Sequence, residues 1–121
     1  NLGADVTTTG TQTYSAATTL SGAARTLEGS IIQTTTINGA QNLAITGNLD
    51  LNGIIGGSNA IGVFSVSGTS NLGANVTTTG TQTYAGAVTL SANVALATSN
   101  DQFAFQLCRF SYGVNCLYME L

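Results

Sequence analysis

Apolar and polar residues alternate along most of this 121-residue chain in short stretches. The alternation is clearest at residues 43–46 (LAIT), 49–52 (LDLN), 61–66 (IGVFSV), 87–90 (AVTL) and 94–97 (VALA). Threonine, valine and isoleucine favour extended backbone because their side chains branch at Cβ. Glycine and asparagine separate the stretches, and no window keeps the 3.6-residue apolar period of a helix over three turns. The pattern therefore predicts an all-β fold built from short strands.

The sequence also repeats itself, which is typical of solenoid proteins. Residues 1–22 read NLGADVTTTGTQTYSAATTLSG and residues 71–92 read NLGANVTTTGTQTYAGAVTLSA, so 17 of 22 positions are identical and Asn1 corresponds to Asn71. A related phrase links the two copies at residues 31–68. Three turns within the period that separates the copies would give each turn about 23 residues, and we expect roughly 20–23 residues per turn.

Two architectures fit these short strands, namely a sandwich or barrel and a parallel β-solenoid. The repeat lies in the sequence itself, so equivalent residues are expected to stack on neighbouring turns. Large aromatic residues are scarce in residues 1–102, where only Tyr14, Phe64 and Tyr84 occur. A narrow interior of small and β-branched side chains suits a parallel β-helix better than a sandwich, so the solenoid is favoured.

Threonines spaced two apart form a candidate ladder in such a solenoid, namely Thr7, Thr9, Thr77 and Thr79. In register, their hydroxyl groups would bond from turn to turn and keep the surface polar without charge. A flat face of ordered threonines is also how some ice-binding solenoids engage ice. The threonine clusters are unevenly spaced, since they begin at Thr7, Thr34 and Thr77, whereas an ice face needs a pair on every turn. Surface threonine chosen for its β propensity is therefore the favoured interpretation.

Charge is scarce, since only 6% of the chain is Asp, Glu, Lys or Arg, against about 25% in a typical soluble domain. There is no histidine, so the commonest general base and metal ligand is missing. Two basic residues are too few to bind a phosphate backbone. No apolar stretch approaches the roughly 20 residues of a membrane-spanning helix. The classes of enzyme, nucleic-acid binder and helical membrane protein are therefore all disfavoured.

The remaining candidate chemistry is also weak. The five acidic residues are scattered singly, and Asp5 becomes Asn75 in the second copy, so the repeat does not require the charge. The glycine-rich segment at residues 53–62 lacks both the lysine of a phosphate-binding loop and the acid of a calcium-binding repeat. We therefore expect no catalytic residue, no cofactor and no metal ion.

Three phrases of the chain resemble a known class of repeats. They are VTTTGTQTYAGAVTL at residues 76–90, TTTINGAQNLAITG at residues 34–47 and IIGGSNAIGVFSVSG at residues 54–68. They look like the repeats of filamentous-haemagglutinin-like adhesins, which are exported by two-partner secretion, and of related autotransporter passengers. The resemblance covers about residues 1–100. It implies a right-handed parallel β-helix, a secreted or cell-surface location and a role as stalk or adhesive rod, and it brings no catalytic residues.

Residues 101–121 depart from the repeat pattern and hold five of the eight aromatic residues and both cysteines. Cys108 and Cys116 are too few for a zinc or iron–sulfur site, and in a secreted chain they would most simply close one small disulfide loop. Some two-partner adhesins end in a cysteine-closed loop that holds the rod in its outer-membrane pore, and residues 108–116 (CRFSYGVNC) resemble that loop in position and size. A cap on the open end of the solenoid is favoured over an anchor or a foreign tail.

Three classes of function remain. The first is a structural and adhesive rod segment of a secreted bacterial surface adhesin, without catalysis. The second is a self-assembling extracellular filament subunit whose uncapped solenoid ends stack on one another. The third and least favoured is an ice-binding solenoid. The expected partners are other copies of the chain or neighbouring repeats of a longer one, with a surface glycan or cell receptor for the adhesive role.

Overall fold

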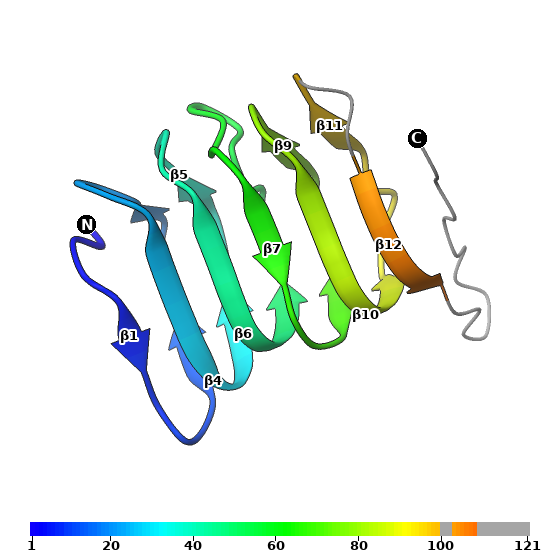
Figure 1. The fold of residues 1–121 in the computed structure, drawn as a ribbon, viewed down its shortest axis with the longest axis horizontal. Coiled ribbons are helices and arrows are strands. Elements are labelled where there is room, and N and C mark those ends of the chain that lie inside the picture. Colours follow the sequence, from blue (N-terminus) through cyan, green and yellow to red (C-terminus); the bar gives the residue numbers. More distant parts are fainter. Residues whose placement is uncertain (100–102, 109–121) are drawn as a thin grey trace.

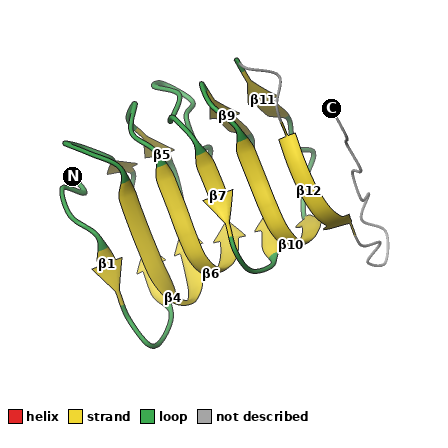
Figure 2. Cartoon of the chain, viewed as in Figure 1, coloured by secondary structure: helices red, strands yellow, loops and turns green. Residues whose placement is uncertain are grey.

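The computed structural model of the chain describes residues 1–99 and 103–108. Throughout these residues the fold is all-β without a helix, and its parallel strands stack as a β-solenoid of about five turns (Figure 1, Figure 2). Each turn lies on the one before it, from the N-terminal turn at one end of the long axis to strand β12 near the other (Figure 1). The expected fold class is confirmed, and the handedness of the coil stays a prediction.

Twelve strands lie within the described residues, and three of them, with nine or ten residues each, are much longer than the rest. They are β1 (Val6–Thr7), β2 (Gln12–Tyr14), β3 (Thr18–Thr19), β4 (Arg25–Thr34), β5 (Ile37–Asn38), β6 (Leu43–Leu51), β7 (Phe64–Val66), β8 (Ser70–Leu72), β9 (Val76–Thr78), β10 (Gln82–Leu90), β11 (Leu96–Thr98) and β12 (Phe103–Cys108). All pairings between these strands are parallel.

Each turn has three sides, which we name A, B and C in chain order. Side A holds β1, β7 and the first halves of β4, β6, β10 and β12. Side B holds β2, β8 and the second halves of the same four strands. Side C holds β3, β5, β9 and β11, with Ile55 bridging the middle of the row. The long strands bend from side A into side B, so these two sides form one sheet.

Some turns are shorter than the expected length of roughly 20–23 residues. Each side needs only six residues, because its strand buries alternate residues and a short corner follows. The buried residues that begin successive sides are Phe64, Ser70, Val76, Gln82 and Val88. Three such sides carry the chain from Ser70 to Val88, and these two residues pair in register on neighbouring turns. A loop within side C, at residues 56–60 between Ile55 and Ile61, lengthens another turn and brings it into the expected range.

The two copies of the repeat do not lie above one another. Val6 lies on side A, whereas its equivalent Val76 lies on side C. Gln12 lies on side B, whereas Gln82 lies on side A. The step from one copy to the other therefore advances the coil by three turns and two further sides. The expectation that equivalent residues stack on neighbouring turns is wrong, because every side accepts the same six-residue pattern.

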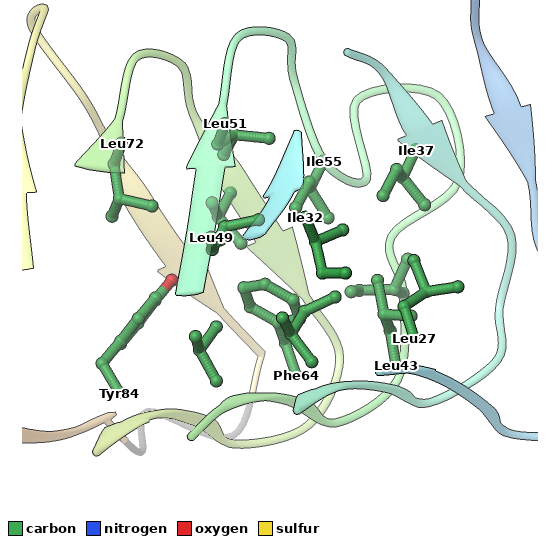
Figure 3. Packing of buried hydrophobic residues seen from close by; sticks show 14 of the residues in the cluster. Leu27, Ile32, Ile37, Leu43, Leu49, Leu51, Ile55, Phe64, Leu72 and Tyr84 are labelled. Atoms are coloured by element: carbon green, nitrogen blue, oxygen red, sulfur yellow. The ribbon is translucent and has the colours of Figure 1, made fainter. Parts of the chain in front are cut away.

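The interior is a narrow column of mostly branched aliphatic side chains (Figure 3). Along side C, Ile37, Ile55 and Val76 follow one another on successive turns, and each is at most 1% exposed. On side A, the rings of Phe64 and Tyr84 meet edge to face, with centroids 5.9 Å apart and planes at 80°. This arrangement is favourable for aromatic pairs. The column therefore continues from turn to turn and joins all the described turns into one core.

A column of glycines forms the corner between sides A and B. Its members on successive turns are Gly10, Gly29, Gly47, Gly68 and Gly86. A Cβ atom on Gly29 would lie 2.7 Å from the carbonyl oxygen of Gly10, and a Cβ atom on Gly47 would overlap the carbonyl oxygen of Gly29. Gly47 also has a φ of 132°, which side chains other than glycine rarely adopt. The turns can stack closely at this corner only because these positions have no side chain.

We expect Gly47→Ala to destabilise the fold by about 1–3 kcal/mol from the backbone conformation alone, and by more because of the overlap. Gly10→Ala is the matched control, since a Cβ atom at Gly10 would meet no other atom within 4 Å. Urea unfolding monitored by circular dichroism measures both effects. Equal stabilities for the two variants would contradict the role of the glycine column.

Ser70 is an interior position where a polar side chain replaces an aliphatic one. It lies between Leu49 and Val88 on side B, and its Oγ atom is buried without a hydrogen-bond partner. Ser70→Ala should therefore raise the free energy of unfolding, by about 1 kcal/mol. Ser67→Ala should lower it, because the Ser67 hydroxyl accepts a hydrogen bond of 3.0 Å from the amide of Gly47. Urea unfolding of both variants tests this difference, and a shift of the same sign in both would contradict it.

Candidate functional site

The threonines of the expected ladder lie on different sides of the coil in the two copies, with Thr7 on side A and Thr77 on side C. Thr7 pairs in register with Glu28, and its hydroxyl lies 3.5 Å from a carboxylate oxygen of that residue. Thr77 pairs with Ala97 on side C. Thr9 is exposed, and Thr79 bonds to the carbonyl of Ile61. The register thus places other residue types beside these threonines.

The second copy of the repeat builds a buried polar corner around Gln82. Its side-chain amide donates hydrogen bonds to the carbonyl oxygens of Val76, at 3.3 Å, and Ala97, at 2.8 Å, and to the hydroxyl of Thr78. The hydroxyl of Tyr84 donates to Oε1 of Gln82 at 2.9 Å. Gln82 and Tyr84 are both 0% exposed. The glutamine therefore joins side A to side C and one turn to the next.

The first copy builds the same corner one side further round the coil. Gln12 donates to the carbonyl oxygens of Val6, at 3.1 Å, and Glu28, at 2.6 Å, and Tyr14 donates to Gln12 at 2.7 Å. Sequence reasoning missed this role for the glutamines. The signal was present in the identical TTTGTQTY of both copies, which keeps a threonine, a glutamine and a tyrosine at fixed spacing. The repeated phrase therefore encodes a corner of the solenoid.

Asparagine and aspartate side chains bond one turn to the next at the corners. Oδ1 of Asp5 accepts from the amide of Thr26 at 2.9 Å, and Oδ1 of Asn75 accepts from the amide of Ala95 at 2.8 Å. The two residues are equivalent in the repeat, and both use one side-chain oxygen. This geometry explains why the repeat accepts either residue at that position.

The outer face of side B carries a row of polar side chains, one from each turn. We call it the outward polar row, and it comprises Thr13, Gln33, Asp50, Asn71 and Thr89. Asp50 is its centre, because one carboxylate oxygen accepts from the amide of Asn71 at 3.0 Å and the other from the amide of Gln33 at 3.4 Å. Thr13 in turn donates to Gln33 at 3.2 Å. The row presents carboxylate, amide and hydroxyl groups in one line along the solenoid.

Within the described residues, no group of three His, Cys, Asp or Glu side chains comes together to hold a metal ion. Asp50 takes part in the outward polar row, while Asp101 and Glu120 lie outside the described residues. No helix in the part that the structure describes is long and apolar enough to span a membrane.

The C-terminal segment joins the solenoid at least in part. Strand β12, which falls inside the expected tail or cap at residues 101–121, pairs in parallel with β10 and follows it from side A to the start of side B. Cys108 ends this strand, whereas Cys116 lies outside the described residues, as does the expected disulfide loop. The aromatic residues from Phe110 onward also lie outside them.

Comparison with known proteins finds no match for this chain among family models, curated proteins or solved structures.

The tyrosine of the buried corner predicts a dependence of stability on pH. Burial raises the pKa of the Tyr84 hydroxyl above its ordinary value of 10.0, and it raises the pKa of Tyr14 as well. In the unfolded chain both hydroxyls lose their protons near pH 10. The stability that the neutral Tyr84 contributes is therefore complete below about pH 10 and declines above it, by about 1.4 kcal/mol per pH unit.

We expect Tyr84→Phe to remove this contribution, so that the free energy of unfolding of the variant declines less steeply between pH 9 and pH 11 than that of the parent chain. Tyr14→Phe is the matched control and should remove less, since the first-copy tyrosine is only partly buried. Urea unfolding at several pH values measures the slopes. An unchanged slope in Tyr84→Phe would contradict the assignment to this hydroxyl.

Proposed function

We propose that the chain is a structural and adhesive rod segment of a secreted bacterial surface adhesin, without a catalytic role. The observation that carries this proposal is how the polar side chains are used. The side-chain amides of Gln12 and Gln82 each donate to a backbone carbonyl on the next turn. The side-chain oxygens of Asp5 and Asn75 each accept from a backbone amide on the next turn. Such bonds hold successive turns together, which is what a rod requires.

The resemblance to filamentous-haemagglutinin-like repeats supports the same proposal. The phrases at residues 34–47 and 76–90 that carry it lie within the stacked turns. Residues 54–68 lie there too and include the loop that interrupts side C between Ile55 and Ile61. The proposed location is therefore outside the cell or on its surface.

The outward polar row is the proposed adhesive surface. Its groups include both hydrogen-bond acceptors and donors, since the Asp50 carboxylate lies between the amides of Gln33 and Asn71. Hydroxyl groups of a glycan can both donate and accept, so an extended surface glycan fits this chemistry. The row follows the rod axis, which lets one glycan chain contact several turns.

A cell-adhesion assay tests the proposal. The chain is displayed on a non-adherent bacterium, and the bacteria retained on an epithelial layer are counted. We expect the chain to raise retention above that of the anchor alone. The double variant Asp50→Ala, Asn71→Ala should lower retention by about tenfold, which corresponds to the loss of about 1.4 kcal/mol of binding energy.

The matched control changes two outward residues of side A, Thr26→Ala and Thr83→Ala, and should leave retention unchanged. Periodate treatment of the epithelial layer should lower retention if a glycan is the receptor. Retention no greater than that of the anchor alone would contradict the adhesive role.

A second candidate is a filament subunit that extends by end-to-end stacking. The observation that favours it is the common direction of the described strand pairings, all of which are parallel along one axis. A further copy can continue such a stack by the same backbone pairing.

A further inference from the structure

Two asparagines of the chain, Asn38 and Asn52, are followed directly by glycine. In such a pair the glycine nitrogen can attack the side-chain carbonyl carbon of the asparagine. Glycine has no Cβ atom to shield its amide, and it adopts backbone angles that other residues avoid. Asn38 ends β5 and Asn52 directly follows β6, so both pairs lie at strand ends. The two pairs share one chemistry, and their surroundings therefore decide which of them reacts.

The first pair is held by the turns on both sides of it. Oδ1 of Asn38 accepts hydrogen bonds from the amides of Ser58, at 3.0 Å, and Asn59, at 3.3 Å. The amide of Gly39, which is the attacking group, donates to the carbonyl oxygen of Asn59 at 3.3 Å. Gly39 is also buried against the backbone of Leu20 on the previous turn. Attack at Asn38 therefore requires the stack to open first.

The second pair is held at neither reacting group. Asn52 is exposed, and within the described residues its side chain makes one hydrogen bond, from Nδ2 to the carbonyl oxygen of Asp50 at 3.5 Å. The amide of Gly53 has no hydrogen-bond partner in that part of the chain. Both the attacking nitrogen and the carbon that it attacks are therefore accessible without any opening of the stack.

Other asparagines of the solenoid show how unusual this is. Oδ1 of Asn42 accepts from the amide of a residue on the next turn at 2.8 Å, and Oδ1 of Asn48 and Asn75 do the same at 2.9 Å and 2.8 Å. Oδ1 of Asn52 makes no such bond to a described residue. Its side chain can therefore react without breaking a hydrogen bond between turns.

We infer that Asn52 is a site of spontaneous deamidation in the folded chain, and that the stack protects Asn38 from the same reaction. The backbone nitrogen of Gly53 bonds to Cγ of Asn52, and the bond from Cγ to Nδ2 breaks. Solvent takes the proton of the attacking amide and supplies one to the departing nitrogen, which leaves as ammonia. Water then opens the resulting succinimide ring at either carbonyl carbon, to give aspartate or isoaspartate. Water is the only co-reactant.

The reaction changes both the surface and the stack. The alternation of β6 turns Leu51 inward and leaves Asp50 and Asn52 facing outward, so a new carboxylate arises beside the outward polar row. It adds one negative charge to the formal net charge of -3. The isoaspartate product also lengthens the backbone at this position, where the amide of Asn52 donates to the carbonyl oxygen of Thr34 at 2.8 Å. Deamidation therefore disturbs a backbone bond between turns.

Peptide mapping of the full chain tests the site. The folded chain is aged in a mildly alkaline buffer, and a second sample is aged in the same buffer with enough urea to unfold it. Cleavage before Asp5, Asp50 and Asp101 then places Asn38 and Asn52 on separate peptides, and mass spectrometry follows the exchange of amide for carboxylate on each. In the folded chain we expect Asn52 to convert faster than Asn38 by about tenfold or more, because Asn38 must first lose its hydrogen bonds.

The unfolded sample is the internal control. Both asparagines should convert there at similar rates, since both precede glycine and no turn holds either of them. Equal rates in the folded chain would overturn the inference, and so would an Asn52 that stays intact there. A preference for Asn52 that is as large in urea would overturn it too, because the preference would then come from the local sequence and not from the stack.

Isoelectric focusing of variants gives an independent measurement. Aged parent chain should acquire a more acidic band, and Asn52→Gln should lack it, because glutamine must close a larger ring and does so slowly. Asn59→Gln is the matched control, since Asn59 is also exposed but precedes alanine, and it should acquire the band as the parent does. A band of equal intensity in Asn52→Gln would overturn the assignment. These outcomes are independent of the rod function, which the retention assay tests.

Discussion

Backbone hydrogen bonding between successive turns is the constraint on which the rest of this structure depends. Parallel strands stand about 4.8 Å apart, and the chain must keep that spacing at the corners as well as along the sides. The glycine column follows from it, because at Gly47 a carbonyl of the turn below occupies the space of a Cβ atom. The hydrogen bonds at the corners have the same origin, since the side-chain oxygens of Asp5 and Asn75 each accept from a backbone amide one turn away.

The same constraint explains what the repeated phrase encodes. A corner leaves backbone carbonyls pointing inward, and buried carbonyls need donors. Gln12 and Gln82 supply those donors, and the tyrosine two residues later donates to each glutamine in turn. The near-identity of the two copies therefore reflects one solution to a local hydrogen-bonding requirement, placed on two different sides of the coil.

Much of the fold could be predicted from the sequence, because alternation and self-similarity are direct consequences of stacked strands. The turn length and the side that each copy occupies could not be predicted. The offset between the copies fits three equal turns as well as it fits three and two-thirds turns of shorter length, which is what the structure has. The six-residue spacing was hidden because Ser70 and Gln82 are polar residues in interior positions. The neighbours of Thr7 and Thr77 depend on register, which the sequence alone leaves open.

The equivalence of the three sides gives this architecture an unusual tolerance of length changes. A chain that gains six residues at a corner moves every later residue to the next side, and one that loses six moves them to the preceding side, while each inward position still faces the core. Surface residues beyond that point then turn by a third of a revolution. Small duplications can thus redirect an exposed surface around the rod axis while the interior keeps its pattern.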